Sequence, residues 1–158
     1  MEELAVHSCT NRRAMNLVHI LLVEDNEGDI LLIREVFENA HIVNQISVVK
    51  DGKEATDFML KIGKYESVSS PDLILLDINL PKKNGHEVLQ FIKTNDQFIQ
   101  IPVIMLTTSA FDSDILKAYK NHVNCYISKP LEADSFSDVL LKIENFWCSV
   151  VTLPVQKI

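Results

Sequence analysis

The sequence predicts an α/β fold, in which a doubly wound parallel sheet of five strands carries helices on both faces. Short apolar runs recur along the chain, and most of them do not alternate with polar residues, as expected of strands buried on both faces. Stretches with helical apolar spacing lie between these runs. The two kinds of segment alternate strictly, which is the pattern of parallel strands joined by right-handed crossover helices.

The expected elements can be placed in order along the chain. Five runs predict strands, with the second at a sheet edge: residues 17–23, 45–49, 73–76, 103–106 and 123–127. Five stretches predict helices: residues 30–37, 52–62, 88–92, 113–120 and 136–147. Asp51 stands directly before the second helix, where an aspartate side chain can cap the first turn.

Length and composition indicate one domain. The chain has 158 residues, 47% of them hydrophobic and 23% charged, which is ordinary for a globular protein with a sizeable core. The formal net charge of −7 argues against nucleic-acid binding by charge. The three cysteines are odd in number and form no Cys-x-x-Cys pair, so we expect free thiols in the cytoplasm.

Three segments follow from this pattern. Residues 1–16 lack clear periodicity and are expected to be a flexible N-terminal arm, without the apolar stretch of a signal peptide. Residues 17–148 form the predicted domain, and no run in the chain approaches membrane-spanning length. Residues 149–158 are apolar without helical spacing, so this tail is expected to pack on its own domain or across a homodimer interface.

Polar side chains follow four of the predicted strands at the point where each strand ends. Glu24 and Asp25 follow the first strand, Asp77 the third, Thr107 the fourth and Lys129 the fifth. Ligands of open α/β sheets bind at this carboxyl edge, so three carboxylates, a hydroxyl and an ammonium are expected to meet there.

This set of groups suits phosphoryl transfer assisted by a metal. Clustered carboxylates repel one another unless a cation intervenes, and an all-oxygen site with few protein ligands suits Mg²⁺. An aspartate can accept a phosphoryl group covalently. Mg²⁺ and Lys129 would offset the charge on the phosphoryl oxygens, and Thr107 would donate a hydrogen bond to one of them.

From about residue 18 to about residue 147, the chain resembles the receiver domains of two-component response regulators. Four stretches carry the resemblance, each after its strand: 22–25 (LVED), 75–81 (LLDINLP) followed by Gly85, 106–109 (LTTS) and 126–130 (YISKP). Two others are similar to small single-domain regulators that act with phytochrome-type sensor histidine kinases: 80–85 (LPKKNG) and 146–154 (FWCSVVTLP). The resemblance implies a flavodoxin-like sheet with strand order 2-1-3-4-5.

The resemblance also implies a role for individual residues. Asp77 would be the phosphoacceptor. Asp25 and Asp77 would bind Mg²⁺ directly, Glu24 would bind it through a water, and the backbone carbonyl of Asn79 would complete the protein ligands.

Further residues would bind the phosphoryl group or respond to it. Thr107 would move toward the phosphoryl group and Tyr126 would swing inward after it. Lys129 would pair with a phosphoryl oxygen, and the bond from Lys129 to Pro130 would be cis. The implied partner is a sensor histidine kinase or a phosphotransfer domain, and output would pass through protein contacts of the fourth helix, fifth strand and fifth helix.

Plainer interpretations also exist, and Asp77 could merely end a strand. Glu24 and Asp25 could simply mark a helix start, and Thr107 could be an N-cap. Tyr126 could be an ordinary strand aromatic, and Lys129 an exposed loop residue.

Two positions depart from the family pattern. Glu24 stands where most members have aspartate, so its carboxylate reaches one methylene farther. His122 stands where relatives often have glycine at a helix end, which predicts strain or a changed end for the fourth helix.

Three other functions share parts of this pattern. An aspartyl-phosphate phosphatase of the haloacid dehalogenase type would need a second aspartate where Asn79 stands. A degenerate receiver would bind partners without phosphorylation, although the acidic set here is complete. A flavodoxin-type flavin binder would need a Ser/Thr/Gly-rich phosphate loop after the first strand, and the sequence has none.

Overall fold

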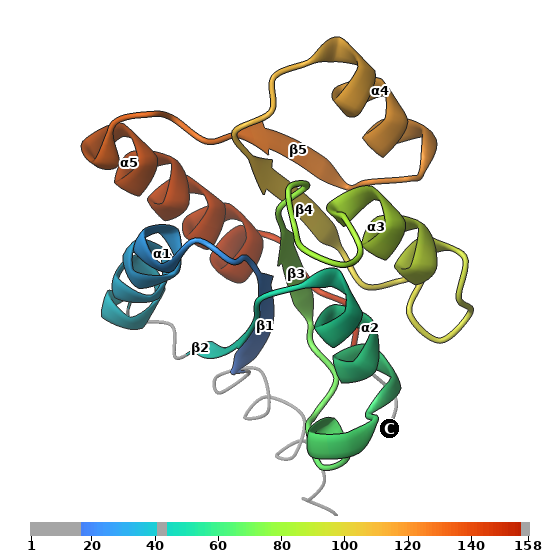
Figure 1. Ribbon diagram of the computed structural model, residues 1–158. Coiled ribbons are helices and arrows are strands. Elements are labelled where there is room, and N and C mark those ends of the chain that lie inside the picture. Colours follow the sequence, from blue (N-terminus) through green and yellow to red (C-terminus); the bar gives the residue numbers. More distant parts are fainter. Residues whose placement is uncertain (1–16, 41–43, 156–158) are drawn as a thin grey trace, which may run out of the picture.

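The computed structural model describes residues 17–40 and 44–155, and these form the predicted parallel sheet with helices on both faces (Figure 1). The strand order is β2-β1-β3-β4-β5, and every neighbouring pair is parallel. The predicted fold class and strand order are therefore confirmed. The predicted arm at residues 1–16 lies outside the described residues.

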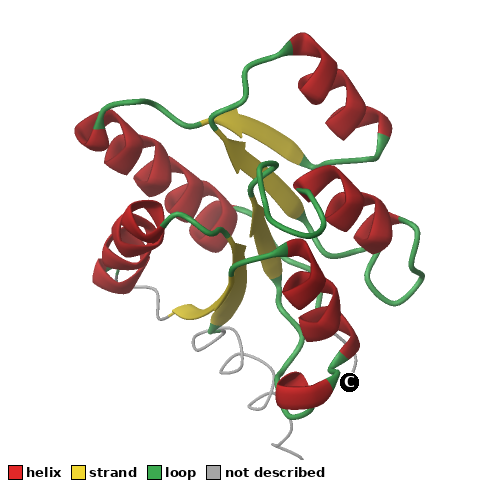
Figure 2. Cartoon of the chain, in the orientation of Figure 1, coloured by secondary structure: helices red, strands yellow, loops and turns green. Residues whose placement is uncertain are grey.

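The observed elements follow the predicted order closely (Figure 2). The strands are β1 (Val18–Val23), β2 (Asn44–Val49), β3 (Leu73–Leu76), β4 (Val103–Thr107) and β5 (Cys125–Ser128). The α-helices are α1 (Glu27–Asn39), α2 (Gly52–Leu60), α3 (Gly85–Lys93), α4 (Asp112–Lys120) and α5 (Ala133–Glu144). A short 3-10 helix, η2 (Gly63–Tyr65), follows α2, and a π-helical segment, η3 (Asn145–Val150), continues α5.

Two apolar cores lie on opposite faces of the sheet. Alternate strand residues point to alternate faces, so Leu21 and Leu76 join the core under α2 and α3. Leu22 and Leu75 join the core under α1 and α5, which lie side by side in Figure 1. Every residue of β1, β3 and β4 is buried, and full burial of such a side chain stabilises the fold by about 1.5–3 kcal/mol.

Side-chain caps fix where the helices near the site begin. The Asn26 side chain accepts the Asp29 N–H at the start of α1, and the predicted cap Asp51 accepts the Glu54 N–H at the start of α2. At the start of α3, Asn84 and Glu87 form a reciprocal capping box. These caps hold the first turns of three helices at the carboxyl edge of the sheet.

The end of α4 adopts a left-handed turn at His122, the position at which the sequence predicts strain. His122 has φ +65°, its N–H donates to the Tyr119 carbonyl (3.0 Å), and the Val123 N–H donates to the Ala118 carbonyl (3.1 Å). These two bonds form a Schellman motif with a histidine in the position that favours glycine. The expectation of strain at this helix end is met by the positive φ.

The chain after α5 is helical farther than its sequence indicates. Residues 145–150 continue α5 as a π-helical turn, and the Val151 N–H donates to the Phe146 carbonyl (2.8 Å). Beyond this turn Leu153 packs against the core under α1 and α5. Among the described residues, no helix is both long enough and apolar enough to cross a membrane.

Candidate phosphoacceptor site

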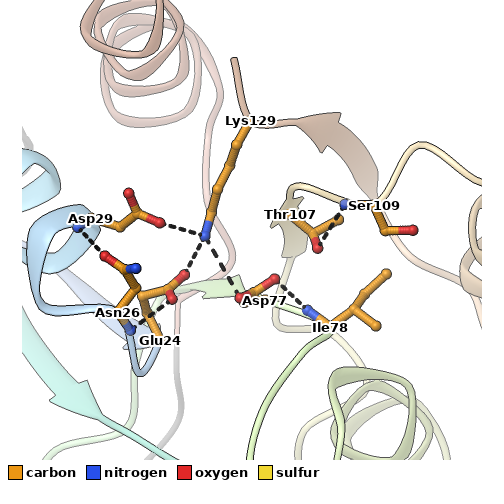
Figure 3. Close-up of polar contacts among 8 residues, drawn as sticks. All are labelled: Glu24, Asn26, Asp29, Asp77, Ile78, Thr107, Ser109 and Lys129. Atoms are coloured by element: carbon orange, nitrogen blue, oxygen red, sulfur yellow. Dashed lines mark hydrogen bonds and ion pairs between the residues drawn. The ribbon is translucent and has the colours of Figure 1, made fainter. Parts of the chain in front are cut away.

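The carboxyl ends of the strands bring the predicted polar residues together (Figure 3). Glu24 follows β1, Asp77 follows β3, Thr107 ends β4 and Lys129 follows β5. Their side chains meet at one edge of the sheet although they come from four separate strands. The plainer interpretation of Thr107 as an N-cap is excluded, because α4 begins at Asp112 and its N-cap residue is Phe111.

Three carboxylates form a cluster that suits a hard divalent cation. Glu24, Asp25 and Asp77 each offer one oxygen atom, and these atoms all lie within 4.8 Å of one another. Glu24 and Asp77 are buried, whereas Asp25 is exposed. An oxygen-only set that is open on one side fits Mg²⁺ or Mn²⁺, which bind few protein ligands and keep several waters.

Lys129 is the cation of this site in the structure. Its ammonium lies 2.5 Å from Glu24 Oε2, 3.0 Å from Asp29 Oδ2 and 3.6 Å from Asp77 Oδ2, and its side chain is only 4% exposed. This burial excludes the plainer interpretation of an exposed loop residue. Lys129 also connects the acidic cluster to Asp29 in the first turn of α1, a contact that the strand-end pattern does not predict.

The charges around Lys129 do not balance. Burial raises the pKa of Glu24, and the hydrogen bond from Lys129 offsets this only in part. Burial by itself would lower the pKa of Lys129, but the hydrogen bond to Glu24 and the charge of Asp77 outweigh it and raise that pKa. Glu24, Asp29 and Asp77 all lie within 4 Å of the Lys129 ammonium, so carboxylates outnumber this ammonium, and a divalent cation would offset the excess of negative charge.

Asp77 is held rigidly by the backbone around it. Its Oδ1 accepts the Ile78 N–H (2.8 Å), and its own N–H donates to the Val23 carbonyl (3.1 Å). Gly85, the first residue of α3, lies so close that an added Cβ would stand 2.1 Å from the Asp77 carbonyl oxygen. The glycine in the family-like stretch at 80–85 therefore lets α3 begin directly against the Asp77 backbone.

The two expected switch residues meet in the loop between β4 and α4. Thr107 is fully buried and its Oγ1 accepts the Ser109 N–H at 3.4 Å. The Tyr126 hydroxyl donates to the Ser109 carbonyl (2.8 Å), so its ring is held at this loop. Thr107 and Tyr126 are thus connected through one residue, Ser109.

Two expectations about backbone groups have different outcomes. The structure has no cis peptide bond among its described residues, so the predicted cis bond between Lys129 and Pro130 is wrong. The trans isomer is favoured by about 0.5–1 kcal/mol before proline, and with it Lys129 still reaches Glu24. The metal-binding role of the Asn79 carbonyl stays a prediction.

The chain is similar to known proteins in sequence and in structure. A family model described as response regulator receiver domain matches residues 20–141. Response regulator Rcp1 of Synechocystis sp. is 44% identical over 135 residues, covering 85% of this chain and 92% of that protein. The probable methanogenesis regulatory protein FilR2 of Methanothrix harundinacea is 42% identical over 128 residues, covering 81% and 82%.

Solved structures with similar folds include two response regulators, RcpA and Rcp1. The phosphorylated cyanobacterial phytochrome response regulator RcpA matches with a TM-score of 0.86 and 45% identity, over 88% of this chain and 99% of that one. The Mn²⁺-bound form of response regulator Rcp1 matches with a TM-score of 0.86 and 43% identity, over 87% and 99%.

Proposed function

The chain belongs to the response regulator receiver domain family, and on that premise we propose that it is a phosphorylation-controlled switch whose phosphoacceptor is Asp77. The observation that carries this proposal is the meeting of Asp77 with a second buried carboxylate, Glu24, and a buried ammonium, Lys129. An aspartate can act as the nucleophile in phosphoryl transfer, and the nearby ammonium of Lys129 can stabilise the negative charge of the phosphorylated product.

The proposed reaction forms an acyl phosphate on Asp77. A carboxylate oxygen of Asp77 attacks the phosphorus of a phosphohistidine in the partner, and the P–N bond breaks with its electron pair going to the imidazole. Lys129 would pair with a phosphoryl oxygen, and the Thr107 hydroxyl would donate to another. The switch is turned off by slow hydrolysis. Water attacks the phosphorus, the bond between the phosphorus and the Asp77 oxygen breaks, and inorganic phosphate and the free carboxylate are restored.

Mg²⁺ is the proposed cofactor. Glu24, Asp25 and Asp77 would hold it together with the Asn79 carbonyl, and when bound it would offset the negative charge of the phosphoryl oxygens. The Mn²⁺-bound form of Rcp1 supports a divalent cation in a relative of this chain.

The proposed partner is a phytochrome-type sensor histidine kinase or a phosphotransfer domain, acting in the cytoplasm. Support comes from the similarity to RcpA, which is described as a phytochrome response regulator. The proposed output passes through protein contacts. The surface of α4, β5 and α5 is suited to this, because Phe111 (73% exposed) and Leu116 (56% exposed) present apolar surface there.

Intact-mass spectrometry tests the phosphoacceptor. The protein is incubated with acetyl phosphate, with and without Mg²⁺, as wild type, as Asp77→Asn and as the control Asp96→Asn, which changes an exposed aspartate after α3. A gain of one phosphoryl group that requires Mg²⁺, occurs in wild type and control, and disappears in Asp77→Asn would support the proposal. A folded wild type that gains no phosphoryl group from acetyl phosphate or from a phosphorylated kinase would overturn it, and would point to a module that binds partners without phosphorylation.

A further inference from the structure

A hydrogen-bond network beside the phosphoacceptor site joins α3, α4 and β5. His86 Nε2 in the first turn of α3 lies 3.0 Å from Asp114 Oδ1 in the first turn of α4. The Ser109 hydroxyl donates to the other oxygen of the same carboxylate, Oδ2, at 2.5 Å. The Tyr126 hydroxyl donates to the Ser109 carbonyl at 2.8 Å. We refer to these four residues as the α3–α4 network.

Ser109 is the residue on which the network depends. Its N–H donates to Thr107, its hydroxyl donates to Asp114 and its carbonyl accepts from Tyr126. Figure 3 shows the first of these bonds beside Asp77. A displacement of Ser109 would therefore alter its hydrogen bonds to Thr107, to Asp114 on α4 and to Tyr126 at the same time.

His86 is a buried imidazole that packing alone does not explain. Its side chain is 5% exposed, and its Nδ1 atom is buried without a hydrogen-bond partner among the described residues. Because a carboxylate only accepts hydrogen bonds, Nε2 must carry the proton that is shared with Asp114. An aliphatic side chain at this position would bury no unpartnered nitrogen. Burying this nitrogen therefore costs free energy that an aliphatic side chain would not cost, and the bond from Nε2 to Asp114 is the interaction that can offset it.

We propose that His86 is a positioning residue for the switch. By fixing Asp114 it holds Ser109 in place, and through Ser109 it holds Tyr126 at the β4–α4 loop before any phosphoryl group is present. The inference rests on the proposed function for its input, which is the response of Thr107 to phosphorylation of Asp77. Movement of Thr107 would then pull on Ser109 and so reach α4 as well as Tyr126.

Fluorine NMR on protein labelled with 3-fluorotyrosine tests the network without phosphorylation. The Tyr126 resonance is assigned with Tyr126→Phe, and its exposure is read from the shift between H₂O and D₂O, with the exposed Tyr119 as internal reference. In His86→Leu and in Asp114→Ala, the ratio of Tyr126 released from the Ser109 carbonyl to Tyr126 bound to it should rise about fivefold, which corresponds to the loss of about one net hydrogen bond. Asp112→Ala, an exposed change in the same turn of α4, should leave Tyr126 unchanged.

His86→Gln separates positioning from folding. A glutamine amide can still donate to Asp114, so this variant should stay close to wild type, whereas a variant that merely lost packing would not be rescued. Unchanged Tyr126 exposure in folded His86→Leu and Asp114→Ala would overturn the inference.

Acetyl phosphate labelling of the same variants relates the network to the switch. The rate of Asp77 phosphorylation should change severalfold in His86→Leu and Asp114→Ala and not in Asp112→Ala. Labelling rates in both variants equal to wild type would overturn the link to the switch. A wild type that cannot be phosphorylated at all would contradict the proposed function, while the fluorine measurement would still decide on the network.

Discussion

The Lys129 ammonium lies within ion-pair distance of three carboxylates, those of Glu24, Asp29 and Asp77. Glu24 and Asp77 belong to the predicted metal and phosphoacceptor site, but Asp29 does not, and its Oδ2 is only 3.0 Å from the ammonium. Asp29 is partly exposed, and α1 positions it through the N-cap bond from its N–H to Asn26. It therefore competes with Asp77, and later with the phosphoryl group, for the same proton donor.

Asp29→Asn should raise the fraction of phosphorylated protein. With the competing charge removed, Lys129 would pair more often with the phosphoryl oxygens, and a gain of about two- to fivefold in the steady-state ratio corresponds to one partly exposed charged hydrogen bond. The measurement is intact-mass spectrometry in acetyl phosphate at saturating Mg²⁺. The control Glu27→Gln removes a neighbouring acid of α1 whose partner is Lys50. A phosphorylated fraction that falls in Asp29→Asn alone would show that Asp29 assists Lys129.

The residues of the site divide into those that the sequence predicts and those that it does not. Asp77 and Lys129 could be predicted because both stand at strand ends, and all strand ends of a parallel sheet meet at one edge. Asp29 stands inside a helix, where an acid in the first turn is common for reasons of helix stability alone. The contact between His86 and Asp114 joins α3 to α4, and it depends on how two helices pack rather than on any local pattern.

A buried histidine far from the site should make stability depend on pH. His19 on β1 is 5% exposed, and its ring nitrogens lie 2.8 Å from Ser47 Oγ and 3.1 Å from Ser69 Oγ. Burial lowers the pKa of His19 below its usual value of 6.5. The folded state thus binds the proton less readily than the unfolded state.

We expect the free energy of unfolding to be highest above pH 6.5 and to decrease as the pH falls below it. Urea unfolding at pH 5.5 and 7.5 measures this loss in wild type and in His19→Gln, which removes the titrating group. The loss should be smaller in the variant, and the difference between the two proteins isolates His19 from the other histidines. An equal loss in both would assign the pH dependence to other groups.

At the scale of elements, two helices end at residues whose backbone conformation favours glycine, although neither residue is glycine. His122 after α4 has φ +65°, and Lys61 after α2 has φ +56°, so two helices end in left-handed turns made by residues other than glycine. A left-handed conformation costs an L-residue about 1–2 kcal/mol. Substitution by glycine removes this strain, but glycine also has more conformational freedom in the unfolded chain, which cancels a part of the gain.

His122→Gly should stabilise the protein by about 0.5–1 kcal/mol, because the Schellman bonds stay and the strain is removed. The free energy from urea unfolding is the measure. Asn121→Gly is the matched control, since Asn121 has φ −91° and gains nothing from glycine. The control should therefore lose about 0.5–1 kcal/mol. A loss in His122→Gly would mean that the imidazole makes a contact worth more than the strain.

Gly85→Ala should disturb the loop that carries the phosphoacceptor. The new Cβ would stand 2.1 Å from the Asp77 carbonyl oxygen and 2.7 Å from Ile78 Cα, both of them backbone atoms that cannot move aside cheaply. We expect about 1–3 kcal/mol of destabilisation and slower phosphorylation of Asp77 by acetyl phosphate. Gly28→Ala is the control, because its Cβ would meet only the Asn26 side chain, at 3.3 Å. Normal phosphorylation in Gly85→Ala would show that α3 can shift without moving Asp77.

The elements that could be predicted are those with a strong local pattern. The apolar run at 73–76 matches β3 residue for residue, and Asp51 caps α2 as expected. The π-helical turn at 145–150 is predicted only as far as residue 147, where the helical apolar spacing ends, and its placement depends on the core that Trp147 and Cys148 contact. The isomer before Pro130 likewise depends on the whole site, because the two isomers differ little in free energy.

At the scale of the whole molecule, the C-terminal segment covers one core only in part. Trp147 and Leu153 pack against the core under α1 and α5, whereas Phe146 is 51% exposed and Val150 is 65% exposed. These two exposed side chains and the half-exposed Leu141 present an apolar surface along α5 and η3. We propose that this surface lies in a homodimer interface, which is one of the two placements expected for the C-terminal tail.

Val150→Asp should lower the oligomeric mass in solution. A charge at the proposed interface would have to be desolvated without a partner, which costs more than a small interface can supply. Light scattering after size-exclusion chromatography gives the mass, and Leu31→Asp is the control, because Leu31 is equally exposed (68%) but lies on α1. A dimer in wild type and Leu31→Asp with a monomer in Val150→Asp would place the interface at the C-terminal segment. The same mass in all three proteins would remove this segment from any dimer interface, and its function would then be to cover the core through Trp147 and Leu153.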